Sequence, residues 1–154
     1  SNALGMKVSI YSSYFNSIKD DFKNYDSSDL TNILSNSDII SFHCKPNKDG
    51  SSIITKDEFN MMKKNCILVN TARGGLINEA DLIQALKNNV IKGAALDVFT
   101  KEPLEESELF NLENIILTPH IAASTDEAQI VVAEMVANQF CEYFKNNNIV
   151  NSIT

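Results

Sequence analysis

The stretch of sequence that best indicates the fold is residues 66–79, which read CILVNTARGGLINE. The continuous apolar run at 67–70 is typical of a strand that is buried on both faces of a parallel sheet. A turn with two glycines follows, and Asn78 can then cap a helix that carries apolar residues at helical spacing. Strand, turn and helix in this order form the unit from which parallel sheets are built.

The same alternation continues on both sides of this stretch. Apolar runs typical of strands stand at 6–11, 38–42, 94–99 and 115–118. Capping-box spacing at 55–58 and again at 124–127 marks two further helix starts. In the second of these helices we expect the following side chains to face the core: Ile130, Val131, Met135, Val136, Phe140 and Phe144. The pattern predicts one α/β domain with a doubly wound, Rossmann-like parallel sheet.

Composition excludes several other classes of protein. The chain has 154 residues, a formal net charge of −7 and 44% hydrophobic residues, which is too apolar for a disordered tail. It has no apolar run near the roughly 20 residues that span a bilayer. An acidic chain without a Lys/Arg cluster also argues against a nucleic-acid binder. We therefore expect a cytoplasmic protein that binds neither membrane nor nucleic acid.

The cysteines and histidines point the same way. Cys44, Cys66 and Cys141 are widely spaced and form no C-x-x-C pair, which indicates a reducing compartment. Cys66 and Cys141 lie in apolar surroundings, so we expect both to be small core residues. His43 and His120 have no cysteine or histidine at metal-ligand spacing, and no metal site is expected.

Polar residues follow three neighbouring strands of the predicted sheet. Arg73 comes after the third run, Glu102 after the fourth and His120 after the fifth, with Asp97 inside the fourth run. In open parallel sheets, ligands bind at the carboxyl edge, where the strands end. Each residue also has a simpler interpretation. Arg73 can be a surface cation and Glu102 a loop carboxylate. His120 can be a strand-end histidine, and Asp97 a core carboxylate with a partner. Their convergence on one edge favours a site.

The chemistry of these side chains is complementary. A guanidinium such as that of Arg73 can grip a substrate carboxylate at two points, which a lysine cannot. A carboxylate such as Glu102 beside the imidazole of His120 would favour the protonated ring and fix its tautomer. Such a pair can protonate a carbonyl oxygen as a hydride reaches the carbon. A buried carboxylate at Asp97 needs a partner.

Three stretches carry a resemblance to a known family: 68–75, then 95–103, then 117–121. Together they resemble the nicotinamide-binding domain of the D-isomer-specific 2-hydroxyacid dehydrogenases, a group that includes D-3-phosphoglycerate dehydrogenase. The similarity runs from about residue 4 to 129. It implies hydride transfer between a nicotinamide cofactor and a 2-hydroxy or 2-oxo acid.

The resemblance also implies roles for single residues. Arg73 would bind the substrate carboxylate, His120 would be the acid/base, and Glu102 would tune it. Asp97 would accept a hydrogen bond from the nicotinamide carboxamide. Arg73 and His120 would also border the cofactor, which further residues would line: Ser12, Cys44, Thr71, Ala72, Ala122 and Ala123. His43 is expected to be structural rather than catalytic.

The chain departs from the family pattern at its adenosine side. Ser12 stands where the family usually has an acidic residue for the ribose, and Lys45-Pro46-Asn47 replaces a proline-led turn. Serine neither binds the ribose hydroxyls strongly nor repels a 2′-phosphate. No arginine follows Ser12 or Ser13, which favours NAD and leaves NADP open.

The family's first strand and glycine-rich phosphate loop would precede Leu4. Residues 1–3 are interpreted as the remnant of a cleaved tag, and residues 4–154 as a partial nicotinamide-dinucleotide-binding domain without the substrate domain. A sheet that lacks its first, central strand leaves backbone groups unpaired. We expect such a chain to be inactive by itself and to form a homo-oligomer or to rearrange. Two alternatives to the enzyme therefore stand: a non-catalytic dinucleotide-sensing or partner-binding module, and an inactive oligomerising remnant.

Overall fold

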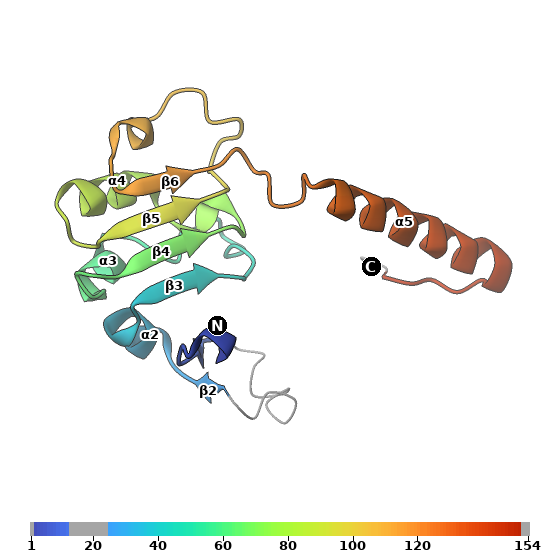
Figure 1. The fold of residues 1–154 in the computed structure, drawn as a ribbon, viewed down its shortest axis with the longest axis horizontal. Helices are drawn as coiled ribbons and strands as arrows, with labels where there is room; N and C mark the ends of the chain where they lie inside the picture. Colours follow the sequence, from blue (N-terminus) through green and yellow to red (C-terminus); the bar gives the residue numbers. More distant parts are fainter. Residues whose placement is uncertain (1, 13–24, 152–154) are drawn as a thin grey trace. The chain divides into compact units, whose positions relative to one another are not determined.

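The computed structural model describes residues 2–12 and 25–151 (Figure 1). The chain divides into two compact units, residues 1–119 and 120–154, and each is described by itself. The first contains the sheet and the second a long helix. Ser13, which the sequence analysis considered with the cofactor, lies outside the described residues.

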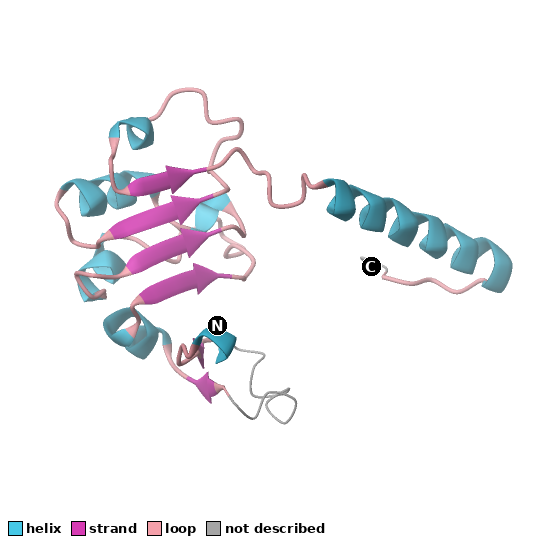
Figure 2. Ribbon diagram, viewed as in Figure 1, coloured by secondary structure: helices cyan, strands magenta, loops and turns pink. Residues whose placement is uncertain are grey.

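A four-stranded parallel sheet forms the first unit. Its strands, in spatial order, are β3 (Ile39–Phe42), β4 (Ile67–Asn70), β5 (Gly93–Leu96) and β6 (Ile115–Leu117). All neighbouring pairs are parallel, so all four carboxyl ends lie at one edge of the sheet (Figure 2). The predicted α/β, Rossmann-like class is confirmed.

Helices connect the strands of the first unit. They are α2 (Leu30–Asn36), α3 (Lys56–Met61) and α4 (Glu79–Lys87), with short 3₁₀ turns at η1 (Asn2–Leu4), η3 (Gly74–Leu76) and η4 (Glu108–Asn111). At the start of α3, the Glu58 carboxylate accepts hydrogen bonds from both the backbone N–H and the hydroxyl of Thr55, at 2.9 and 2.6 Å. The hydroxyl bond holds the pKa of Glu58 below its ordinary value. The two predicted helix starts at Thr55 and Asn78 are therefore confirmed.

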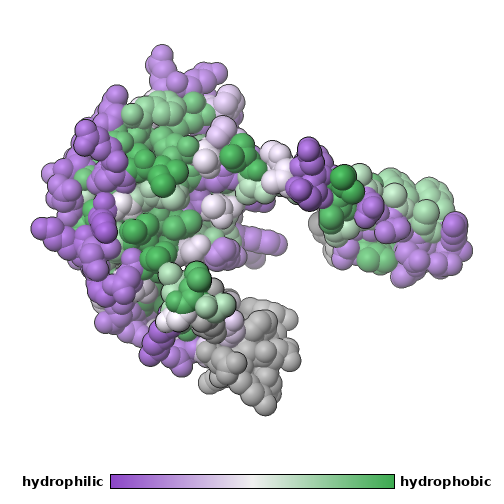
Figure 3. Space-filling view, in the orientation of Figure 1, coloured by the Kyte–Doolittle hydropathy of each residue, from purple (hydrophilic) through white to green (hydrophobic). Residues whose placement is uncertain are grey.

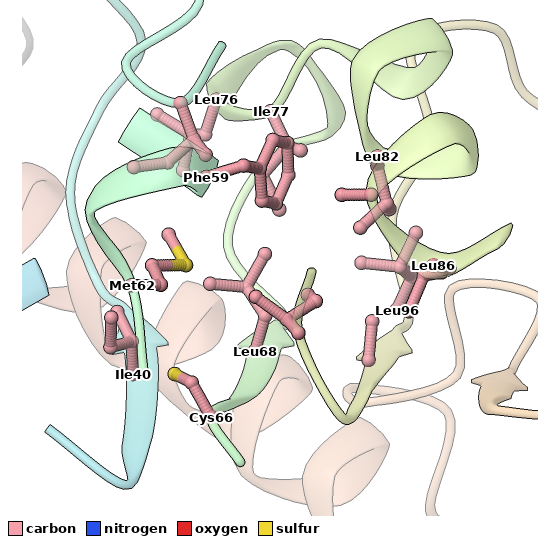
Figure 4. Packing of buried hydrophobic residues seen from close by; sticks show 14 of the residues in the cluster. Ile40, Phe59, Met62, Cys66, Leu68, Leu76, Ile77, Leu82, Leu86 and Leu96 are labelled. Atoms are coloured by element: carbon pink, nitrogen blue, oxygen red, sulfur yellow. The ribbon is translucent and has the colours of Figure 1, made fainter. Parts of the chain in front are cut away.

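The core lies between one face of the sheet and the helices. Leu68 and Leu96 point from the strands toward Phe59 of α3 and Leu82 and Leu86 of α4 (Figure 4). All five side chains are buried. This packing holds the strands together and so fixes where their carboxyl ends stand.

The opposite face of the sheet differs from what the apolar runs predicted. Burial alternates along β3, where Ile40 and Phe42 are buried while Ile39 is 48% exposed. At the other edge, Ile116 of β6 is 68% exposed. For these two edge strands, burial on both faces is wrong, because the helices that connect the strands pack their apolar side chains into a single core. In β4 the second face is half-buried, at Ile67 and Val69. Apolar runs report composition and not which faces find a partner.

The first residues of the chain form a separate sheet. The strand β1 (Ser9–Ile10) pairs in parallel with β2 (Asp26–Ser27), and the predicted run at 6–11 is strand only in part. Neither β2 nor α2 was predicted. Within the described residues, β1 does not pair with β3, so β3 is an edge of the larger sheet.

The second unit consists of α5 (Asp126–Asn146) and its flanking residues. Thr125 caps it by accepting a hydrogen bond from the Ala128 N–H at 3.1 Å, inside the predicted capping box. None of its side chains is buried, and apolar side chains show along its surface (Figure 3). In the second unit, described by itself, this stripe and Cys141 are exposed and not buried as predicted: a single helix has no second surface of its own on which to bury them.

Candidate active site

The site begins with the turn after β4, which Asn70 holds in place. Asn70 is the last residue of β4 and only 1% exposed. Its amide nitrogen donates to the Arg73 carbonyl at 2.8 Å, and its amide oxygen accepts from the Ala72 N–H at 3.1 Å. Both ends of one buried amide are thus used to shape the turn. The backbone that carries Arg73 is fixed by the sheet itself.

Arg73 presents its side chain at this turn. The side chain is exposed, and Nη1 donates to the Ala72 carbonyl at 2.6 Å. Among the residues that the structure describes, no carboxylate forms an ion pair with it. The remaining guanidinium N–H groups can therefore meet an anion from outside the chain. That this anion is a substrate carboxylate stays a prediction.

Asp97 lies just after β5 and is buried, 4% exposed. Its Oδ1 accepts a hydrogen bond from the hydroxyl of Thr118 at 2.6 Å, while the backbone N–H of Thr118 donates to Leu96. The ends of β5 and β6 are joined in this way. Thr118 was not singled out from the sequence, although a hydroxyl directly after an apolar run is a usable signal.

Glu102 belongs to the loop that follows. It is exposed, and its Oε1 accepts from the Phe99 N–H at 2.9 Å. The neighbouring N–H, that of Thr100, donates to the Glu79 carboxylate of α4 at 2.6 Å. Two successive backbone amides are therefore held by two carboxylates, one from the loop and one from a helix.

The loops after β4 and β5 touch at Gly74. A β-carbon at Gly74 would stand 1.9 Å from the Phe99 carbonyl carbon and 2.5 Å from the Thr100 nitrogen. Only glycine permits this approach. Neither Gly74 nor Gly75 adopts a left-handed φ, so it is the close packing at Gly74 that requires a glycine. The structure thus brings the backbone next to Arg73 against the loop of Glu102.

His120 is the first residue of the second unit, two positions after Thr118. It is exposed and adopts a φ of 54°, which non-glycine residues seldom do. Ala122 and Ala123, the other expected cofactor contacts of this segment, are exposed as well. The left-handed backbone conformation of a histidine costs about 1–2 kcal/mol, and such strained residues are common at functional sites.

The other expected cofactor contacts lie in the first unit. Ser12, Cys44 and Thr71 are exposed, and Ala72 is half-buried. Cys44 and Thr71 follow the adjacent strands β3 and β4, so they share the carboxyl edge with Arg73. His43, one residue before Cys44, is exposed and its Nε2 lies 2.9 Å from the Ser41 hydroxyl.

Comparison with known protein families identifies the family of this chain. The profile of the family described as "D-isomer specific 2-hydroxyacid dehydrogenase, NAD binding domain" matches residues 1–122. The chain belongs to this family. The resemblance stated from the three motif stretches is confirmed.

Relatives of this dehydrogenase family are similar over most of the chain. The glyoxylate reductase of Thermococcus litoralis is 42% identical over 126 residues, which cover 80% of this chain and 38% of that protein. The D-3-phosphoglycerate dehydrogenase of Archaeoglobus fulgidus is 40% identical over 81% of this chain and 24% of its own length. The chain thus spans well under half of these relatives.

Solved structures of the dehydrogenase type share the fold. An acyclic imino acid reductase in complex with NADPH and D-Arg aligns with a TM-score of 0.86 at 33% identity, covering 99% of this chain and 48% of that one. The D-lactate dehydrogenase of Lactobacillus jensenii, with NAD⁺, aligns with a TM-score of 0.86 at 27% identity, covering 99% and 49%. The family is an NAD-binding one, and its neighbours carry either NAD⁺ or NADPH.

The carboxylate of Asp97, just after β5, has the chemistry that a nicotinamide requires. It is a hydrogen-bond acceptor, as its bond from the Thr118 hydroxyl shows. A carboxamide brings N–H donors, from which such a carboxylate can accept hydrogen bonds.

In the described residues no three His, Cys, Asp or Glu side chains are grouped as a metal site would need. No helix in this part of the chain is long and apolar enough to cross a membrane.

Proposed function

We propose that the chain is the cofactor-binding part of an oxidoreductase that transfers a hydride between a nicotinamide cofactor and a 2-hydroxy or 2-oxo acid. The observation that carries the proposal is the arrangement after β4 and β5, where the turn of Arg73 packs on the loop of Glu102 at the Gly74–Phe99 contact. Family membership supports the same reaction class.

Arg73 binds the substrate in this proposal. Its guanidinium donates two parallel hydrogen bonds to the carboxylate of a 2-oxo acid, and this fixes which face of the carbonyl is presented. The buried amide of Asn70 holds the turn, so the backbone that carries Arg73 is already ordered before the substrate binds. Asp97 accepts from the carboxamide and orients the nicotinamide ring.

His120 moves the proton. When bound, NADH supplies a hydride to the carbonyl carbon. The His120 imidazolium then gives its proton to the carbonyl oxygen, which becomes the hydroxyl of the product, and the neutral ring takes a proton back in the reverse direction. Glu102 favours the protonated ring and holds its tautomer. We infer NAD as the cofactor, with NADP open because Ser12 is neutral, and a cytoplasmic homo-oligomer as the working form.

The test is turnover in the whole protein. The gene is expressed with whatever sequence it encodes on either side of residues 1–154, and oxidation of NADH and NADPH is followed with a panel of 2-oxo acids. His120→Asn keeps a residue type that tolerates a left-handed φ and removes the acid/base. We expect it to lower kcat by about 100- to 10,000-fold.

Arg73→Lys tests the substrate contact separately. It keeps the charge and loses the two-point geometry, so we expect a raised KM for the oxo acid. Absence of turnover with every acid, or full activity of His120→Asn, would contradict the proposed function. Nucleotide binding without any turnover would point instead to a dinucleotide-sensing module.

A further inference from the structure

Glu79 stands in the first turn of α4 and reaches out of its own helix. Its Oε1 accepts the backbone N–H of Thr100 at 2.6 Å, across 21 positions of sequence. Its place at a helix N-terminus is favourable for a carboxylate in any case. The bond to Thr100 is additional and ties α4 to the loop after β5.

The atoms that Glu79 holds are next to those that hold Glu102. Thr100 donates to Glu79, and the preceding N–H, of Phe99, donates to Glu102 at 2.9 Å. A backbone shift at Thr100 therefore also moves the donor of Glu102. Glu102 itself is exposed and belongs to a loop that contains no strand or helix before η4.

The same segment of chain also carries Arg73. Arg73 is the residue before η3, and α4 begins soon after η3 ends. Gly74 seats the Phe99 carbonyl against its backbone, with room for no side chain. Gly74 and Glu79 thus both lie against the same peptide group of the β5 loop, the one that joins Phe99 to Thr100, and both come from one short segment.

We propose that Glu79 is a positioning residue for Glu102: by holding the Thr100 amide, it sets where the Glu102 carboxylate stands relative to the turn of Arg73. The inference rests on the proposed function, in which Glu102 acts on the acid/base. Glu79 touches neither substrate nor cofactor in this scheme. Its effect is on proton transfer, and hence on kcat, and little on binding of the oxo acid.

Asp81 provides a matched control. It lies in the same first turn of α4 and also accepts a backbone N–H from outside the helix, that of Lys56 at 3.0 Å. Asp81→Ala removes an equal charge and an equivalent bond without touching the β5 loop. A loss that comes only from a weakened α4 would appear in Asp81→Ala as much as in Glu79→Ala.

The experiment compares Glu79→Ala, Glu79→Gln and Asp81→Ala in the whole protein. We expect Glu79→Ala to lower kcat by about 10- to 100-fold with KM for the oxo acid within about threefold, since small misplacements near the chemistry have effects of this size. Glu79→Gln keeps an acceptor oxygen and should recover most of the rate. In Glu102→Gln, adding Glu79→Ala should lower kcat little further.

Amide hydrogen exchange on residues 1–154 gives a readout that needs no turnover. The Thr100 amide should exchange faster in Glu79→Ala and keep its protection in Glu79→Gln and Asp81→Ala. Equal kcat in Glu79→Ala and the parent, or equal losses in Glu79→Ala and Asp81→Ala, would overturn the inference and leave the proposed function standing. A parent without turnover would overturn the proposed function, and the catalytic role of Glu79 would fall with it.

Discussion

The Asp97 carboxylate accepts a hydrogen bond of 2.6 Å from the Thr118 hydroxyl, and this bond joins the ends of the adjacent strands β5 and β6. Asp97 is buried, so much of what makes its charge tolerable comes from such donors. The bond also fixes the last residue pair before the chain leaves the sheet toward His120. It serves stability and site geometry together.

Thr118→Val should therefore destabilise the first unit. The variant keeps the shape of the side chain and removes the hydroxyl donor, and a buried acceptor that loses a partner costs about 1–3 kcal/mol in the free energy of unfolding. Denaturant unfolding of residues 1–154, followed by circular dichroism, measures it. Thr118→Ser keeps the hydroxyl and should unfold near the parent midpoint; equal midpoints for the two variants would refute the role given to this bond.

Gly74 and Gly75 should respond oppositely to alanine. At Gly74 a β-carbon would meet the Phe99 backbone at 1.9 Å, so one of the two loops must move. We expect Gly74→Ala to lower the free energy of unfolding by about 1–3 kcal/mol or more.

Gly75 is the control for that substitution. Nothing lies within 4 Å of a β-carbon there and its φ is not left-handed. Gly75→Ala should be neutral or stabilise by up to about 1 kcal/mol, through the unfolded state. Thermal unfolding of both variants decides the matter, and similar losses at the two positions would contradict the packing described for Gly74.

The sequence was informative where structure depends on neighbours within about four residues. The helix starts at Thr55, Asn78 and Thr125 rest on hydrogen bonds between residues three apart. The first two were predicted at the capping residue itself, and the third one residue early, because the predicted capping box begins at Ser124. The strand at 67–70 was predicted residue for residue. Convergence of Arg73 and Glu102 on one edge followed from the parallel order of the strands.

What depends on distant partners was not visible in the sequence. The contact of Gly74 with Phe99 and the bond of Glu79 to Thr100 each join residues more than 20 positions apart. The stripe of α5 shows the reverse error: helical periodicity says that a face is apolar, and not what covers it. The role of Asn70 could not be predicted either, because its buried amide shapes the turn through hydrogen bonds that only the structure shows.

The three thiols should differ in reactivity. Burial raises the pKa of the Cys66 thiol to about 11, while Cys44 and Cys141 are exposed. Because the thiolate is the nucleophile, an aromatic disulfide reagent at pH 8 should label two thiols quickly and the third only as the protein opens. Three equally fast thiols would contradict the burial of Cys66.

The raised pKa of Cys66 also gives stability a direction with pH. The folded pKa, about 11, lies above the ordinary thiol pKa of 9.0, so the thiol's contribution is complete below pH 9 and is lost as pH rises through about 11. The midpoint of denaturant unfolding should fall across this window in the parent and less in Cys66→Ala. An equal fall in both proteins would assign the alkaline loss to other groups.

The edge of the sheet at β3 is expected to drive self-association of residues 1–154. Within the described part of the chain, β3 pairs only with β4, and the Ile39 side chain of β3 is 48% exposed. An exposed apolar edge strand is a template for a second strand, and a lysine on the edge strand opposes such pairing.

Ile39→Lys should raise the dissociation constant of self-association by about tenfold or more, which corresponds to about 1.4 kcal/mol. Met61→Lys makes the same change in charge on α3, where Met61 is 40% exposed, and should leave association unchanged. Sedimentation equilibrium over a range of concentrations measures both, and a parent that stays monomeric throughout would refute the expectation.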